Sequence, residues 1–165
     1  MKRVFKMGIL LAMTVSIAMN SCSEKDEEDK VGTGYGQIEF QGDTYHLDAS
    51  NMYILLNEGY PPLHQINLWS KGQRRSFLIV LKSTSEKELQ AGIYVGEDIE
   101  SFQFSWFEGL IGFYDKSFDS QIEIYKNGKT FDIVFTANTL VEGEQLLECV
   151  VTWSGTLPIA AKRRF

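Results

Sequence analysis

Apolar and polar residues alternate with a period of two over most of the chain beyond residue 36. Phe102 and Phe104 alternate with polar neighbours within 101–107, and Ile38 and Phe40 do so near the start. This period is typical of β-strands with one buried face, whereas a helix would repeat every 3.6 residues. Turn-forming Gly, Pro, Asn and Asp residues separate the alternating runs, so the pattern predicts many short strands.

The first two runs predict a hairpin. Gly42-Asp43 as a two-residue turn would place Phe40 opposite Tyr45 on an apolar face. The opposite, solvated face would then carry Glu39 and His46 as a pair.

Asn127-Gly128 is the strongest short-range hairpin signal in the chain, and it predicts Ile124 opposite Phe131. A last long strand is expected over 145–157. Cys149 lies on its apolar side, so we expect a buried core thiol rather than a nucleophile.

The middle of the chain predicts a further hairpin, with strands at 65–69 and 75–82. Phe77 to Leu81 is apolar at every position, which indicates a central strand covered on both faces. Ser83 to Leu89 is the one segment with a helical pattern, because Ser85 and Glu88 have capping-box spacing. Further strands are expected at 52–56 and 92–95.

Without a convincing long helix, this pattern predicts an all-β fold. An antiparallel β-sandwich is the first expectation, and a small, lipocalin-like β-barrel is the alternative. The folded part is expected to be one domain over 36–165, a size that can bury a real core.

The first 21 residues have a different pattern. Lys2, Arg3 and Lys6 precede an apolar run, Met7 to Met19, that is shorter than the roughly 20 residues a membrane-spanning helix needs. Cys22 follows. This order predicts an export signal over 1–21 that ends at a lipid-attachment site.

Ser21-Cys22-Ser23, followed by the acidic run Lys25-Asp26-Glu27-Glu28-Asp29, resembles the start of small surface lipoproteins of the Bacteroidetes. The resemblance implies cleavage before Cys22, modification of Cys22 by acyl chains such as palmitate, and display of the domain outside the outer membrane. The part of the chain from Ile122 onward also resembles uncharacterised β-domains of these lipoproteins, without a motif for an activity. Residues 22–35, with glycines at 32 and 34, are then expected to form an acidic and Gly-rich tether.

Ordinary secretion is the alternative, with a cut after Ala18 and a periplasmic or secreted protein. An uncleaved anchor is a third reading. Two or more acyl chains would hold the protein stably, whereas one chain holds it only marginally.

The net charge of the chain limits the classes of partner that it can bind. The whole chain carries a net charge of −6, and without residues 1–21 it has 13 basic against 22 acidic residues, which is −9. Nucleic acid requires a basic surface and is therefore excluded as a partner. The acyl anchor, rather than the protein surface, is the expected membrane contact.

The residues that commonly carry chemistry are sparse, so we expect no enzyme, no cofactor and no metal. His46 and His64 are the only histidines, too few for a multi-histidine zinc site. Glu97, Asp98 and Glu100 lie in one predicted turn, where neighbouring carboxylates point apart rather than converge as a glycosidase pair.

Aromatic side chains are the remaining candidates for function, because flat rings stack on sugars. Some exceed what an alternating core requires; the expected ligand-binding residues are Tyr60, Trp69, Tyr94, Trp106 and Tyr114. The sequence thus predicts a lipid-anchored binding protein whose partner is a glycan or an envelope protein. A barrel that carries a small lipophilic ligand and a structural subunit of an envelope assembly are the alternatives.

Overall fold

The computed structural model describes residues 30–72, 75–106, 109–113, 119–141 and 145–165, and their side chains outside 105–113 and 139–147. This part contains eleven strands and one turn of 3₁₀-helix, η1 (Gly96–Asp98). No helix within it is long and apolar enough to cross a membrane. The strands are β1 (Gly32–Phe40), β2 (Asp43–Leu56), β3 (Leu63–Ser70), β4 (Arg75–Lys82), β5 (Gly92–Val95), β6 (Ile99–Trp106), β7 (Gly109–Phe113), β8 (Ser120–Asn127), β9 (Thr130–Val141), β10 (Gln145–Thr156) and β11 (Ile159–Arg164).

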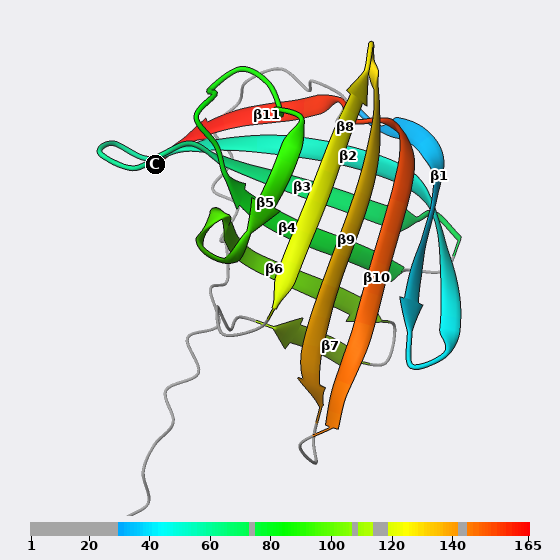
Figure 1. The fold of residues 1–165 in the computed structure, drawn as a ribbon. Helices are drawn as coiled ribbons and strands as arrows, with labels where there is room; N and C mark the ends of the chain where they lie inside the picture. Colours follow the sequence, from blue (N-terminus) through cyan, green and yellow to red (C-terminus); the bar gives the residue numbers. More distant parts are fainter. Residues whose placement is uncertain (1–29, 73–74, 107–108, 114–118, 142–144) are drawn as a thin grey trace, which may run out of the picture.

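All of these strands belong to one sheet, in the order β5-β8-β9-β10-β1-β2-β3-β4-β6-β7. Neighbours in this order run antiparallel, and β11 adds to β2 in parallel. The front strands β8, β9 and β10 cross steeply over β2, β3, β4 and β6 behind them (Figure 1). The all-β prediction is confirmed, and the single, nearly closed sheet fits the barrel alternative.

β2 is the strand that joins the two layers. Its first half pairs with β1, and its second half, from Ala49 onward, pairs with β3 on one edge while 52–56 pair with β11 on the other. Opposite Asp48, β1 has an extra residue between Thr33 and Gly36, which makes a β-bulge. Bulges bend a strand and increase its twist, so this one lets the sheet turn from the front layer to the rear layer.

The start of β1 corrects the predicted tether. Residues 32–35 were expected to be linker, but Gly32 and Thr33 pair with β2, and Gly34 and Tyr35 pair with Gly155 and Ser154 of β10. The glycines are needed here because the indole of Trp153 lies against the backbone of Gly34 and Gly36, where a side chain would collide with it. Their spacing therefore reflects close packing rather than flexibility.

All three predicted hairpins exist, including the one formed by β3 and β4, but the two with two-residue turns were placed in the wrong register. Gln41 and Gly42, with φ of 55° and 84°, form the first turn, so Phe40 faces Asp43 rather than Tyr45. Positive φ at both turn residues is the geometry of a type I′ turn, which matches strand twist. The predicted Glu39–His46 pair is consequently wrong, because His46 faces Gln37.

In the second hairpin the turn residues are Gly128 and Lys129, between the paired residues Asn127 and Thr130. Gly128 has φ of 63°, as required at the first position of a type II′ turn. Ile124 therefore faces Ile133 instead of Phe131. The inward face stays apolar, because a shift of two residues keeps every side chain on its side.

Two further segments differ from the prediction. Residues 83–89 contain bends and no helix, although the Ser85 hydroxyl still accepts hydrogen bonds from the Lys87 and Glu88 N–H groups at 3.2 and 3.3 Å. Leu89 fixes this segment by packing into the core. At the other end of the chain, 159–164 form β11, a strand beyond the last one that was predicted, at 145–157.

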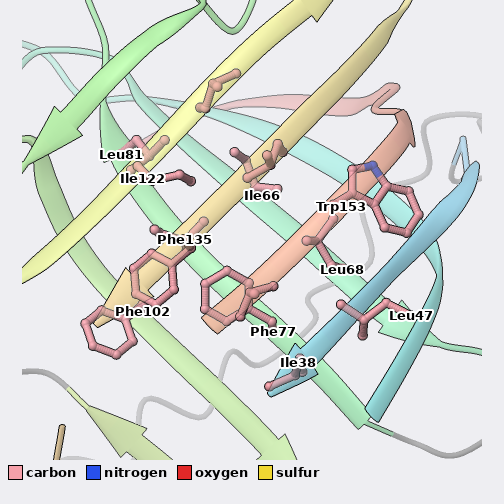
Figure 2. Close-up of a cluster of buried hydrophobic side chains, with 14 of the residues drawn as sticks. Ile38, Leu47, Ile66, Leu68, Phe77, Leu81, Phe102, Ile122, Phe135 and Trp153 are labelled. Atoms are coloured by element: carbon pink, nitrogen blue, oxygen red, sulfur yellow. The ribbon is translucent and has the colours of Figure 1, made fainter. Parts of the chain in front are cut away.

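The barrel interior is filled by side chains from both layers. The rings of Phe77 and Phe135 lie 5.0 Å apart between centroids, as do those of Phe102 and Phe135 and those of Phe77 and Phe104. Figure 2 shows Phe77, Phe102 and Phe135 in contact between the crossing strands. Aromatic pairs at this distance contribute about 0.5–1.5 kcal/mol each beyond the area they bury.

Candidate functional site

The two layers present different outer faces. On the front, the outward residues of β8, β9, β10 and β1 include four carboxylates, which define the acidic face: Glu39, Glu123, Asp132 and Glu148. On the rear, the outward residues of β2, β3, β4 and β6 are mostly amide, aromatic, aliphatic or serine. We call this the amide–aromatic face; its described members are Asn51, Tyr53, Leu55, Leu63, Gln65, Asn67, Trp69, Ser76, Leu78, Val80, Ser101 and Gln103.

A chain of hydrogen-bonded amides occupies the middle of the amide–aromatic face. Gln65 Nε2 donates to Asn67 Oδ1 at 3.2 Å, and Asn67 Nδ2 donates to Asn51 Oδ1 at 2.8 Å. Gln65 and Asn67 are two residues apart on β3 and so point to the same side, and Asn51 faces Asn67 from β2. Each amide has a further donor or acceptor beyond these bonds; Gln65 and Asn67 are half-buried, whereas Asn51 is buried and supports Asn67 through its hydrogen bond.

Trp69 lies at one end of this row of amides. It is half-buried, near the end of β3, between Ala49 of β2 and Ser76 of β4. Leu63 and Trp69 are six residue steps apart, a span of about 20 Å at roughly 3.3 Å per step. The amides therefore lie between the indole and the opposite end of the strand.

A pocket of about 220 Å³ lies at that opposite end. It is lined by Leu55, Asn57, Tyr60, Pro61, Leu63, Lys82 and Glu100, and we call it the Tyr60 pocket. Leu55, Leu63 and Lys82 face one another across β2, β3 and β4. The side chain of Tyr60 is 74% exposed.

Charged side chains of this face gather near the same end. Lys82 Nζ lies 3.7 Å from Glu100 Oε2, and the two side chains are about one-third exposed. On β11, the Arg163 guanidinium carbon lies 4.8 Å from the centre of the Tyr53 ring. This cation–π contact covers one face of Tyr53, so Tyr60 and Trp69 are the rings better placed for a ligand.

The other predicted ligand-binding residues do not join this group. Tyr94, on β5, packs against the core and donates a 2.9 Å hydrogen bond to the Gln90 carbonyl. Burial, with a smaller effect of Asp98, raises its pKa. Trp106 is the last residue of β6 and pairs with Gly109, while its side chain, Tyr114 and the predicted lipidation site Cys22 lie outside the described part.

Sequence reasoning missed the amides, because Asn and Gln alternating with apolar residues look like any solvated strand face. It also missed an exposed aromatic pair at the edge of the acidic face. The Tyr35 hydroxyl lies 3.3 Å from His46 Nδ1, and Tyr35 is 61% exposed. Assigning residues 32–35 to a linker removed Tyr35 from consideration.

Two titratable side chains, Cys149 and His64, are buried in the described part of the chain. Cys149 is fully buried, as predicted, and burial raises its pKa to about 12, which keeps it a thiol. His64 is also buried; its Nε2 bonds to the Ser85 carbonyl at 2.8 Å, and burial lowers its pKa. Over the ranges that the structure describes, no three His, Cys, Asp or Glu side chains are grouped to hold a metal ion.

Comparison with models of known protein families, with curated proteins and with solved structures found no match to this chain.

Proposed function

We propose that this chain is a lipid-anchored, non-enzymatic surface protein that binds an uncharged glycan on its amide–aromatic face. The observation that carries the proposal is the hydrogen-bonded row of Gln65, Asn67 and Asn51 between the Tyr60 pocket and Trp69. Sugar rings have an apolar C–H face that fits an aromatic ring, and hydroxyls that both donate and accept, as amides do.

Comparison of the two outer faces favours the amide–aromatic face as the site for a neutral ligand. The four carboxylates give the acidic face a negative charge that favours cationic partners over a neutral ligand. The amide row of the other face needs no counter-ion. The distance of about 20 Å from Leu63 to Trp69 also suits an extended chain of several sugar units.

The interior supports surface binding over the lipophilic-carrier alternative. A carrier needs a hollow interior of some hundreds of Å³. The rings of Phe77, Phe102, Phe104 and Phe135 contact one another in the middle of the barrel and occupy that space.

The binding test is a glycan array probed with the chain lacking residues 1–21 and carrying Cys22→Ser. Trp69→Ala and Asn67→Ala should each weaken binding at least about tenfold, which corresponds to about 1.4 kcal/mol. Tyr125→Ala is the matched control, because Tyr125 is an exposed ring on the acidic side of the barrel. Binding that disappears only with Tyr125→Ala, or no binding to any glycan, would contradict the proposal and favour a protein partner.

The anchor is tested separately in a Bacteroidetes host. We expect the wild-type chain to incorporate a labelled palmitate analogue, to fractionate with the outer membrane and to be accessible to protease on intact cells. Cys22→Ser should abolish all three properties. An unlabelled protein in the culture medium would instead support ordinary secretion.

A further inference from the structure

The Tyr60 pocket is located where a ligand on the amide–aromatic face must end. Its floor is formed by Leu55 and Leu63, which are near the end of β2 and at the start of β3. The connection between those strands, 57–62, supplies three further lining residues, Asn57, Tyr60 and Pro61, which we call the wall of the pocket. A chain of sugar units that followed β3 from Trp69 would meet this wall.

The wall is held in place before any ligand arrives. The Tyr60 N–H donates to the Asn57 carbonyl at 3.2 Å, and Gly59 has φ of 80°, which closes a tight turn. Pro61 and Pro62 restrict the backbone further, and the Pro62 carbonyl accepts a 2.8 Å hydrogen bond from the Ser83 N–H. An exposed ring on such a constrained loop loses little conformational entropy when it binds.

The size of the pocket limits its occupant. Sites for drug-sized ligands have volumes of about 300–1,000 Å³. At about 220 Å³, the Tyr60 pocket suits one ring-sized unit rather than several. The floor of two leucines and the Tyr60 ring would contact the apolar faces of that unit.

The charges of the pocket select an uncharged unit. Lys82 and Glu100 compensate each other at 3.7 Å, so the site carries no excess charge to attract an anion or a cation. Together they offer ammonium donors and carboxylate acceptors beside an apolar floor. Adjacent hydroxyls of a pyranose ring satisfy both, whereas a carboxylate on the ring would bring a second negative charge close to Glu100, against the single ammonium of Lys82.

From this geometry we propose that the Tyr60 pocket binds the terminal, uncharged pyranose unit of a glycan chain, so that the protein recognises chain ends. This inference rests on the proposed function, because it assigns one part of the same face. It adds a specificity that the face alone would not have: a flat face binds the middle of a chain as well as its end.

The test uses neutral cello-, malto- and laminari-oligosaccharides of two to six units, and the corresponding long polysaccharides, in calorimetric titrations. The protein is the chain without residues 1–21, carrying Cys22→Ser. For the series that binds, we expect the number of sites on a long polysaccharide to equal its number of chain ends. Oxidising the terminal C6 hydroxyl to a carboxylate should weaken binding at least about tenfold.

Variants separate the pocket from the rest of the face. Tyr60→Ala and Lys82→Met should weaken binding at least about tenfold at every length, and Tyr60→Phe should retain it because the ring remains. Tyr60 is exposed, so its replacement leaves the fold intact, and Tyr125→Ala serves as the control. If Trp69→Ala abolishes binding while Tyr60→Ala changes it less than twofold, the end-recognition inference is wrong and the proposed function stands. No binding in any series overturns both.

Discussion

An ideal Cβ built on Gly34 would lie 2.6 Å from Cζ2 of Trp153. Non-bonded carbon atoms prefer separations of about 3.5–4.0 Å, so any side chain at residue 34 must displace the indole or the strand. The pairing of β1 with β10 therefore depends on a residue without a side chain at position 34. The sequence pattern had placed this residue in a tether.

The first prediction concerns this contact. Gly34→Ala should destabilise the protein by about 1–3 kcal/mol, the usual range for overpacking a core. Gly72→Ala is the matched control, because nothing lies within 4 Å of a Cβ at that position. Urea denaturation measures both; equal stability of Gly34→Ala and wild type would contradict the contact.

The second prediction concerns the β1–β2 turn. Gln41 is the one non-glycine residue with positive φ among those described, at 55°. Gln41→Gly should therefore stabilise the protein by about 0.5–1 kcal/mol, since it removes that strain. Lys129→Gly, in the other two-residue hairpin turn, relieves no such strain and should be neutral or destabilising. Thermal unfolding compares the two variants with wild type. A melting temperature of Gln41→Gly below that of wild type would contradict the prediction.

The third prediction is a pH dependence of stability that arises from His64. Burial lowers its pKa below the unfolded value of 6.5, and the positive charge of Lys162 acts in the same direction. The folded state thus favours neutral His64, so stability is complete above about pH 6.5 and decreases as the pH falls below it, until His64 in the folded state is also protonated.

Denaturation between pH 7.5 and 5 checks this expectation against two variants. His64→Gln should flatten the part of the decline that begins near pH 6.5, whereas His46→Gln, at an exposed position, should leave the decline as in wild type. If stability decreases with falling pH in His64→Gln as it does in wild type, the decrease arises from titratable groups other than His64.

The fourth prediction concerns Cys149, the only thiol left in a Cys22→Ser variant. With its side chain fully buried and its pKa at about 12, it should not react with thiol reagents at pH 8 while the protein is folded. Reaction should follow the unfolding transition as urea is added. Rapid labelling in buffer without urea would show that β10 opens while the rest of the protein is still folded.

The sequence by itself determined which residues face inward. Period-two alternation with apolar residues such as Ile122, Ile124 and Ile133 specifies strands with one buried face, whatever strand lies beside them. The burial of Cys149, the position of β4 inside the sheet and the existence of the three hairpins followed from local pattern and turn residues in the same way. The expected cover on both faces of β4 was wrong, because Leu78 lies on the outer, half-buried face.

Only the tertiary structure decided how those strands meet. The register of each hairpin depended on which residues took positive φ, and a shift of two residues leaves the alternation unchanged. The Gly34–Trp153 contact and the parallel pairing of β11 with β2 join residues more than 100 positions apart in the chain.

The candidate site, too, was decided by the tertiary structure. Tyr60 and Trp69 were identifiable as aromatic candidates, but their placement at two ends of one face required the strand order. The amides of Asn51 and Asn67 are 16 residues apart and become partners only because β2 and β3 pair in this register. Sequence specifies side-chain chemistry locally, whereas a site arises from contacts between distant strands, which the packing of the whole barrel selects.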